Sequence, residues 1–379
     1  TECAIPSRVV SAAVADPADS NPVSPTPTLP ERIDRELAAF LTERTALLAE
    51  ISPDLGVLSQ ALRAAVLNGG KRLRPTFAYW GWRCVLPAGA PGEDELIRAA
   101  AGLELLHACA LVHDDVMDGS DTRRGQPAAH VRFDAMHRER AWLGNGQSFG
   151  AAGAILLGDL LLSWSEELFT AAIGCLDRSR AREATVEFDR MRTEVVAGQF
   201  LDMLAQARGA FDPDEALRVI EFKTSKYTVQ RPLLLGAAAA GRTPELAAVL
   251  SDYGLLIGEA FQLRDDLLGV FGDPSRTGKP AGDDLREGKR TLLVALAFQA
   301  ADPAQRELLR AGVGDPALTE AGVAELREVL ERTGAHELVE QRILERATEA
   351  AHRLDGASLQ PVAAQALLEL AQAAAHRTS

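Results

Sequence analysis

The sequence predicts an all-α fold, with one large helical domain over residues 31–379. The chain has 379 residues, of which 47% are apolar and only 5% are aromatic. Ala and Leu are abundant, and alternating runs of β-branched or aromatic residues are hard to find, so the composition favours helix over strand. From Glu31 onward apolar residues recur at helical spacing, beginning with Leu37, Phe40, Leu41 and Leu48.

Residues 1–30 differ from the rest of the chain in composition. They hold six prolines, several Ser and Thr residues and few large apolar side chains. Such a segment cannot bury enough apolar surface to offset the conformational entropy that is lost on ordering. We therefore expect a disordered N-terminal tail, to which the residues themselves assign no role.

Helical periodicity divides the remainder into long segments. Residues 119–131 and 272–289 are rich in Gly, Pro and charged residues, which is typical of loops. Pro232 is expected to kink or break the helix that contains it. The expected helices cover about 94–118, 150–175, 178–207, 213–240 and 244–271, with three more between 290 and 375.

The charge and the cysteines exclude several kinds of protein. A formal net charge of −14 argues against a general nucleic-acid binder, which usually carries a basic surplus. The four cysteines are widely spaced and form no CxxC pair, so we expect reduced thiols and a cytoplasmic location. We expect no transmembrane segment, because Asp159 interrupts the apolar stretch 151–162, and the N-terminus has no signal pattern.

Asp114, Asp115 and Asp118 form the first cluster that carries chemistry, at the end of a mostly apolar helical stretch. On a helix, Asp114 and Asp118 lie on one face, where like charges repel each other. A hard divalent cation removes this repulsion, because Mg²⁺ binds carboxylate oxygens and keeps water ligands for a phosphate. For this cluster alone, the alternative interpretation is a solvated helix end with scattered acids.

A second pair of acids, Asp265 and Asp266, ends another apolar helical stretch. Two such clusters, far apart in the sequence, could face each other across a helical bundle. Metal ions that bridge diphosphate oxygens to both walls would then hold a diphosphate between them. Gln262 lies one turn before Asp265 and could orient its carboxylate.

Basic residues accompany both acid clusters. Arginine suits bidentate phosphate contacts, and lysine supplies a point charge. His107 lies two turns before Asp114 on the same face, either as a core histidine or as a donor to phosphate. Any one basic pair is compatible with a solvated surface, but together they indicate an anion site. The basic candidates are Lys71 and Arg74, Arg123 and Arg124, Lys223 with its neighbour Thr224, and Lys279.

The order of these motifs resembles that of the trans-type prenyl diphosphate synthases, also called polyprenyl synthetases. The resemblance covers about residues 31–375, and its motifs are specific only when taken together in order. They are GGKRLRP at 69–75, ELLHACALVHDDVMD at 104–118, RRGQPAAH at 123–130, GDLLL at 158–162, GQFLD at 198–202, FKT at 222–224, FQLRDDLL at 261–268 and GKPAGDDLREGKRTLL at 278–293. The resemblance implies a single all-α bundle of the isoprenoid synthase type around a deep central cavity, and a homodimer.

The resemblance also implies a reaction, a cofactor and a role for each motif residue. The enzyme would join isopentenyl diphosphate head-to-tail to dimethylallyl, geranyl or farnesyl diphosphate, with Mg²⁺ as cofactor. The metal would be ligated by Asp114, Asp118 and Asp265, supported by Asp115 and Asp266. The allylic diphosphate would be held by Arg123, Lys223 and Lys279, with Thr224 and Gln262 nearby. Isopentenyl diphosphate would be held by Lys71, Arg74, His107 and Arg124.

One residue departs from the family pattern. The second acid motif usually continues as DDxxD, but Gly269 occupies the fifth position in this chain. One candidate metal ligand is therefore absent, whereas Asp265, Asp266 and the segment 278–293 remain. We expect activity all the same, with the metal geometry of this wall left open.

Product length is expected to depend on the helix face before Asp114. In the family, bulky aromatic residues at the fourth and fifth positions before the first aspartate favour a C15 product. Here those positions hold the small residues Ala110 and Cys109. A lower floor is then expected from Leu106, Leu103 or a residue of the facing helix such as Trp164. We expect geranylgeranyl diphosphate (C20), with farnesyl diphosphate (C15) and products of C25 or more as alternatives.

Two other functions are compatible with part of the pattern. A class I terpene cyclase also ionises a diphosphate with DDxxD, but it does not need the basic cluster of Lys71, Arg74 and Arg124. A regulatory subunit of a heteromeric synthase typically lacks the first acid cluster, which this chain keeps. Both alternatives therefore rank behind the synthase.

Overall fold

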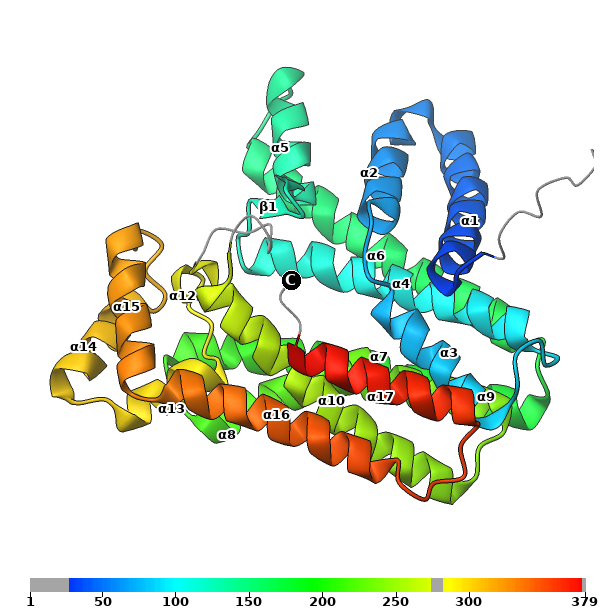
Figure 1. The fold of residues 1–379 in the computed structure, drawn as a ribbon. Helices are drawn as coiled ribbons and strands as arrows, with labels where there is room; N and C mark the ends of the chain where they lie inside the picture. The colour runs from blue at the N-terminus through cyan, green and yellow to red at the C-terminus, as the bar shows by residue number, and fades with distance from the viewer. Residues whose placement is uncertain (1–26, 274–281, 377–379) are drawn as a thin grey trace, which may run out of the picture.

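Long helices make up most of the described chain, and they pack as a bundle (Figure 1). The structure, a computed structural model, describes residues 27–273 and 282–376. The first half contains α1 (Leu29–Ile51), the short turn η1 (Pro53–Leu55), α2 (Gly56–Leu67), α3 (Leu73–Val85), α4 (Glu93–Met117), the hairpin strands β1 (Thr122–Arg123) and β2 (Gln126–Pro127), α5 (Ala129–Glu139), α6 (Gly146–Ile173) and α7 (Arg178–Arg208). The second half contains α8 (Pro213–Val219), the π-helix η2 (Ile220–Gln230), α9 (Arg231–Ala240), α10 (Pro244–Phe271), α12 (Asp283–Arg286), α13 (Leu292–Ala300), α14 (Pro303–Gly312), α15 (Glu320–Arg332), α16 (Ala335–Arg353) and α17 (Pro361–His376). The all-α prediction is confirmed.

Helix α4 carries the first acid cluster and is buried along most of its length. It packs against α6, α3 and α1, and its side chains Leu96, Leu103 and Leu105 are inaccessible to solvent. Full burial of one leucine side chain stabilises a protein by about 1.5–3 kcal/mol. The core therefore fixes α4 firmly, and with it the direction in which its last turn presents acids.

Two glycines bring α3 and α9 into close contact. A Cβ atom at Gly81 would lie 2.0 Å from the carbonyl oxygen of Leu233, and one at Gly236 would lie 1.7 Å from that of Ala78. The two backbones therefore touch where any larger residue would force them apart. This contact joins the GGKRLRP segment, which leads into α3, to the helix that continues from η2.

The C-terminal ends of α4 and α10 lie at the same end of the bundle, beside the β1–β2 hairpin and α12 (Figure 1). Helix α10 packs against η2 and α16, so the second acid cluster is held from two sides. The topology therefore brings together the two acid motifs that the sequence separates.

The structure corrects several expected boundaries. Helix α1 begins at Leu29, inside the segment expected as a tail, and the backbone N–H of Thr28 donates to the Glu31 carboxylate at 2.7 Å. The expected loop 119–131 contains the β1–β2 hairpin. Five helices rather than three lie between Leu292 and His376 in the described part of the chain. The expected break at Pro232 is replaced by a change of helix type, because the chain passes from the π-helix η2 into α9 there.

The expectation that no apolar segment is long enough to cross a membrane is wrong. By length and composition, α4, α6 and α10 could each span one. In α4, 72% of the most apolar 18-residue window is buried inside the protein, against 39% in α6 and in α10. Helices buried on several sides of a large bundle are apolar nearly all round, so composition alone does not distinguish them from spans.

Candidate active site

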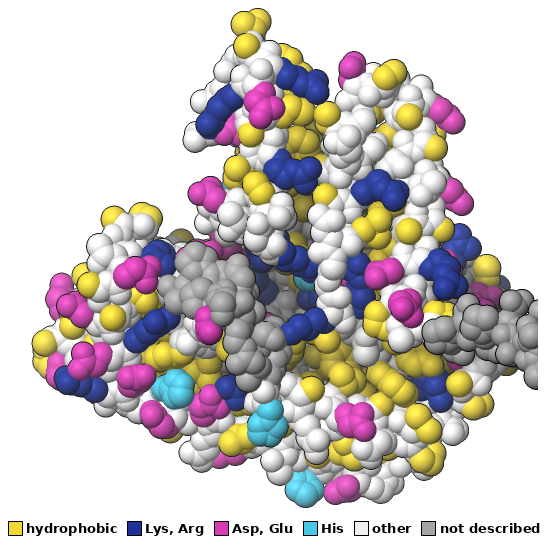
Figure 2. Space-filling model, turned by 45° about the horizontal axis from the view of Figure 1, so that its top comes forward, with side chains coloured by type: hydrophobic (Ala, Val, Ile, Leu, Met, Phe, Trp, Pro, Cys, Tyr) yellow, Lys and Arg dark blue, Asp and Glu magenta, His cyan; other side chains and the backbone are white. Residues whose placement is uncertain are grey.

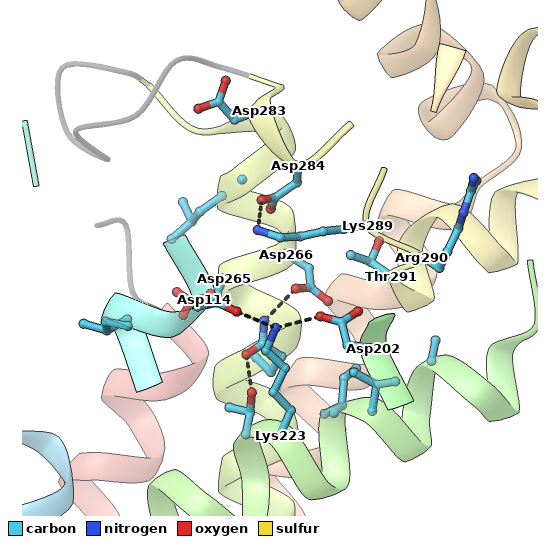
Figure 3. A pocket seen from close by; sticks show the side chains of 18 of the residues that line it. Asp114, Asp202, Lys223, Asp265, Asp266, Asp283, Asp284, Lys289, Arg290 and Thr291 are labelled. Atoms are coloured by element: carbon cyan, nitrogen blue, oxygen red, sulfur yellow. Dashed lines mark hydrogen bonds and ion pairs between the residues drawn. The ribbon is translucent and has the colours of Figure 1, made fainter. Parts of the chain in front are cut away.

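A cavity of about 400 Å³ opens between the ends of α4 and α10 (Figure 3). Side chains from β1, α7, η2 and the segment around α12 complete its wall. The wall carries both acidic and basic side chains, so an ionic ligand would contact both kinds. The charged and polar lining residues are Asp114, Arg123, Asp202, Lys223, Thr224, Gln262, Asp265, Asp266, Asp283, Asp284, Lys289, Arg290 and Thr291.

The three acids of the first cluster point in different directions. Asp114 faces the cavity and accepts hydrogen bonds from Gln199 Nε2 at 2.7 Å and from Lys223 Nζ at 3.4 Å. Asp115 is buried and accepts from Arg123 Nε at 2.8 Å. Asp118 caps the helix, and burial followed by the charge of Asp114 raises the pKa of its carboxyl to about 6. Because neighbouring residues of a helix point in different directions, Asp115 is buried in the protein and Asp114 faces the cavity.

The second wall of the cavity, formed by the acid cluster at the end of α10, contains a chain of two hydrogen bonds. Thr224 Oγ1 donates to Gln262 Oε1 at 2.6 Å, and Gln262 Nε2 donates to Asp266 Oδ1 at 2.7 Å. Gln262 therefore orients Asp266, whereas the sequence suggested that it orients Asp265. Burial raises the pKa of Asp266 to about 8 in spite of the Gln262 bond. The charge of Lys289 lowers this pKa but does not offset the cost of burial.

Lys223 links α4 with α7 from a π-helical segment. Its Nζ donates to Asp202 Oδ2 at 2.6 Å as well as to Asp114. Burial alone would lower the pKa of Lys223, but the charges of Asp114 and Asp202 raise it, so the ammonium is kept. A Cβ atom at Gly198 would lie 2.4 Å from the backbone nitrogen of Lys223, so this glycine lets α7 approach η2 closely. π-Helical turns are rare and frequently mark functional sites.

A second group of cations surrounds His107. Burial and then the charges of Arg74 and Arg124 lower the pKa of His107, with smaller contributions from Arg123 and Arg72. The imidazole is therefore neutral, and its buried Nδ1 has no hydrogen-bond partner within residues 27–273 and 282–376. Arg74 Nη2 donates to Thr228 Oγ1 at 2.9 Å. We call His107, Arg74, Arg124 and Lys71 the basic cluster.

The basic cluster lies outside the lining of the main cavity, and one of its residues lines a second cleft. None of its four residues lines the main cavity, but Arg124 lines a cleft of about 330 Å³ between α2, α4 and α5. Leu111 and Arg123 line both hollows, so the two are adjacent. Figure 2 shows Lys and Arg side chains gathered around the hollow between the α5 arm and the α1–α2 hairpin. In this conformation Arg124 donates to the carbonyl oxygens of Asn68 and Gly69.

Arg72 anchors the segment that carries Lys71 and Arg74. Its backbone is left-handed, with φ of 49°, and its buried guanidinium bonds Glu104 Oε2 at 2.9 Å and Asp34 Oδ1 at 2.8 Å. A left-handed arginine costs about 1–3 kcal/mol, so these ion pairs must hold it in place. Glu104 therefore positions the basic cluster from one turn before His107.

Replacing Glu104 by Gln is expected to destabilise the protein by about 3 kcal/mol, because one buried charge then lacks its partner. Urea unfolding followed by circular dichroism measures this loss. Glu36→Gln is the matched control, since its ion pair with Arg98 is exposed and 3.8 Å long. Equal effects of the two variants would contradict the anchoring role of Glu104.

Comparison with known proteins decides the family. The sequence profile of the family described as Polyprenyl synthetase matches residues 56–330. The chain belongs to the polyprenyl synthetase family. The geranylgeranyl pyrophosphate synthase of Corynebacterium glutamicum, crystallised with isoprenyl diphosphate and magnesium, is 41% identical with a TM-score of 0.88, over 92% of this chain and 98% of its own.

More distantly related synthases are also similar to this chain along most of its length. The structure of the geranylgeranyl pyrophosphate synthetase from Pyrococcus horikoshii is 27% identical with a TM-score of 0.74, and covers 92% of this chain and 99% of its own. A short chain isoprenyl diphosphate synthase of Methanothermobacter thermautotrophicus is 35% identical over 310 residues, which is 81% of this chain and 86% of that protein. The chain is therefore a prenyltransferase that condenses isopentenyl diphosphate with an allylic diphosphate.

Some residues named from the sequence of this synthase are not found at the cavity. Lys279 lies outside the described residues. Of the expected product-length residues, Leu103, Leu106 and Cys109 are buried and Ala110 is half-buried. None of these four lines the main cavity, whose α4 lining consists of Leu111 and Asp114. Their role in product length stays a prediction.

Other residues of the synthase line the cavity or contact the residues that line it, although the sequence interpretation gave them no role. Asp202 pairs with Lys223, and Gln199 donates to Asp114. Lys289 Nζ contacts Asp284 Oδ1 at 2.7 Å and Glu287 Oε2 at 2.8 Å. The GQFLD and GKPAGDDLREGKRTLL motifs contained these residues, but only tertiary contacts distinguish them from ordinary surface charges.

Proposed function

We propose that this synthase makes geranylgeranyl diphosphate in an Mg²⁺-dependent reaction. The observation that carries the proposal is the arrangement of two acid clusters around one cavity, with a separate basic cluster beside it. An allylic diphosphate fits the first position, where metal ions offset its charge. Isopentenyl diphosphate fits the second position, where cations alone would bind it.

The acids suit a metal–diphosphate complex better than a bare metal ion. Within the described residues, no three His, Cys, Asp or Glu side chains lie close enough to hold a metal together. Mg²⁺ usually takes one or two carboxylates and completes its shell with water and phosphate oxygens. Burial raises the pKa values of Asp118 and Asp266, and the nearby lysines, Lys223 and Lys289 for Asp118 and Lys289 for Asp266, do not offset it, so both carboxyls would gain from further positive charge. Mg²⁺ would supply that charge and polarise the diphosphate leaving group.

The side chains around the cavity are proposed to have different roles in this reaction. Asp114, Asp118 and Asp265 would hold the metal ions, and Lys223 and Arg123 would donate hydrogen bonds to the allylic diphosphate. These cations stabilise the charge that grows as the allylic C–O bond breaks. Thr224 and Gln262 keep Asp266 in place through their hydrogen bonds. No side chain of the cavity is proposed as a dedicated base.

The basic cluster is proposed to bind isopentenyl diphosphate. The neutral His107 offers its buried Nδ1, and Arg74, Arg124 and Lys71 would supply positive charge. Two adjacent sites that share Arg123 and Leu111 would hold the reacting carbons side by side. Such positioning turns a bimolecular step into one within a single complex.

The C20 product is supported by relatives and by small residues on α4. Geranylgeranyl diphosphate synthases occur among the relatives, for example that of Methanosarcina mazei, 37% identical over 244 residues. Other relatives are a geranylfarnesyl diphosphate synthase of Aeropyrum pernix and an octaprenyl diphosphate synthase of Escherichia coli. Membership of the family therefore leaves the length open, and Cys109 and Ala110 favour C20 over C15.

Ala110→Phe is expected to shorten the product to C15, because the ring would block the path of the growing chain along α4. The measurement is thin-layer or liquid chromatography of the dephosphorylated products. Ala110→Val should give a mixture, since its side chain is smaller. An unchanged C20 product in both variants would contradict the proposed floor.

A homodimer is proposed from an exposed apolar face on α6 and α7. Val196, Phe200 and Met203 are 68%, 59% and 42% exposed, and they lie along one face of α7. Ile155 and Leu156 on α6 are 46% and 63% exposed. A cluster of large apolar side chains of this kind marks a protein interface. Light scattering should give twice the chain mass, and Phe200→Glu should give the single-chain mass; a monomeric unmodified protein would contradict the proposal.

The direct test of the function uses radiolabelled isopentenyl diphosphate with dimethylallyl, geranyl or farnesyl diphosphate as starter. We expect labelled C20 diphosphate from all three. Incubation with geranylgeranyl diphosphate alone is the control for a terpene cyclase, which would release a hydrocarbon. Activity that appears only after a partner chain is added would favour the regulatory subunit. The cytoplasmic location stays a prediction.

A further inference from the structure

Arg231 lies at the junction between the π-helix η2 and the α-helix α9. Its backbone N–H donates to the carbonyl oxygen of Lys226, five residues earlier, which is a bond of the π-helical type. The next residue, Pro232, has no N–H and cannot donate a backbone hydrogen bond across the junction. The backbone is therefore one hydrogen bond short at this point, and side-chain contacts to neighbouring helices gain importance.

The guanidinium of Arg231 ties this junction to α7 through two acids. Its Nε and Nη2 donate to the two carboxylate oxygens of Glu194 at 2.7 and 2.6 Å, and its Nη1 donates to Glu187 Oε2 at 2.8 Å. Glu187 is buried and also accepts from Arg242 Nη2 at 2.8 Å. A planar fork that bonds both oxygens of one carboxylate has a defined geometry, so it fixes two helices more firmly than a single contact does.

The same two elements carry a second ion pair, between Lys223 on η2 and Asp202 on α7 (Figure 3). Lys223 precedes Arg231 along the chain, whereas their partners on α7 occur in the reverse order, so the two elements run antiparallel. Gly198 lies between Glu194 and Asp202 and lets α7 touch the backbone of Lys223. The two ion pairs therefore depend on one register between α7 and η2.

We propose that Arg231 is a positioning residue of the synthase, because its fork fixes the end of η2 on α7 and thereby holds the ammonium of Lys223 at the cavity. The inference rests on the proposed function, in which Lys223 donates to the allylic diphosphate. Arg231 does not line the main cavity, so it acts through Lys223. Each residue of an α-helix turns by about 100°, so relaxation of the π-helix by one residue would turn Lys223 away from Asp114 and Asp202.

A double-mutant cycle tests this role on four full-length proteins: the unmodified chain, Arg231→Gln, Lys223→Met and the double variant. Arg231→Gln is expected to lower kcat by about 10–10²-fold, as when a catalytic group is displaced by about 1 Å. The KM for isopentenyl diphosphate should stay within about twofold, because the basic cluster is unchanged. The double variant should match Lys223→Met within about threefold, since Arg231 then has no lysine left to position.

Arg346→Gln is the matched control. Like Arg231, Arg346 bonds an acid of a neighbouring helix, Glu259, to which a second arginine, Arg342, also donates. Arg346 does not line the main cavity, so its loss should leave kcat within about twofold. Arg231→Lys keeps the charge but not the fork, so it should recover only part of the lost kcat. A loss in Arg346→Gln as large as that in Arg231→Gln would contradict the proposal.

Urea unfolding of the four proteins of the cycle tests the positioning without reference to activity. Lys223→Met breaks the ion pair with Asp202, and it should destabilise the Arg231→Gln variant less than the unmodified chain. The reason is that Lys223 is no longer held at Asp202 once the fork is absent. Equal destabilisation in both backgrounds would overturn the proposal. So would an unmodified kcat in folded Arg231→Gln, or kinetic losses that multiply in the double variant.

If Arg231→Gln does not fold, Glu194→Gln takes its place in both cycles, because it breaks the fork and leaves the bond to Glu187 intact. The same results are then expected, and the same results would overturn the proposal. A lack of any product from the unmodified chain would refute the proposed function instead. The unfolding cycle would still decide whether Arg231 positions Lys223.

Discussion

Asp114→Asn is expected to lower kcat/KM by about 10³-fold, which corresponds to about 4 kcal/mol of lost transition-state stabilisation. The substitution preserves shape but removes a carboxylate that faces the cavity and contacts both Gln199 and Lys223. A neutral amide binds Mg²⁺ less well and leaves the diphosphate charge uncompensated as the C–O bond breaks. Steady-state kinetics with farnesyl diphosphate as starter measures the loss.

Asp121→Asn is the matched control for this variant. Asp121 is an exposed acid three residues after Asp118, and it does not line the main cavity. We expect activity within about twofold of the unmodified chain, as for most surface substitutions. Equal losses at Asp114 and Asp121 would mean that general charge, rather than metal binding by the first cluster, supports the reaction.

Lys223→Met is expected to lower kcat/KM by about 10²–10³-fold, the usual cost of one lost donor to a developing oxyanion. Lys223 connects Asp114 on α4 with Asp202 on α7, so its loss removes the cation that lies between these two acids. The fall should include kcat, because the diphosphate gains charge in the transition state. Kinetics at saturating isopentenyl diphosphate separates the two parameters.

Lys226→Met provides the comparison on the next turn of the same helix. Lys226 pairs with Glu221 at 2.9 Å and does not line the main cavity. Its removal should leave kcat/KM within about threefold, because a partly exposed ion pair contributes little. Thermal unfolding of both variants checks that Lys223→Met is folded. A folded Lys223→Met variant with full activity would exclude Lys223 from the site.

Helix ends with clear capping residues were predictable from the sequence. The expected helix 178–207 is observed as Arg178–Arg208, where Asp177 accepts from Ser179 N–H and Gly209 ends the helix with φ of 64°. Helix α10 likewise starts after Thr243 with Pro244 in its first turn. The π-helix around Lys223 was not predictable, since its apolar residues follow the same spacing as those of a regular helix.

The candidate site was also predictable from the sequence only in part. The motifs identified Asp114, Arg123, Lys223, Gln262 and Asp265, and the cavity brings these residues together. Asp114 and Asp265 could be found because clustered acids at the end of an apolar helix repel each other unless a cation binds them. The roles of the other three were implied by the resemblance to the family. The sequence pattern did not indicate that Asp284 lies against Gly269 and contacts Lys289, because these are tertiary contacts of the folded chain.

The most direct test of two acid walls that bind a metal–diphosphate complex is calorimetry with Mg²⁺ and inorganic pyrophosphate, each alone and together. Because no three described acids form a closed metal site, Mg²⁺ alone should bind weakly. Pyrophosphate alone should also bind weakly, since the acids repel it. Tight binding is predicted only for the two together, and it should be lost in Asp114→Asn. Equally tight binding of either component by itself would contradict the proposed site.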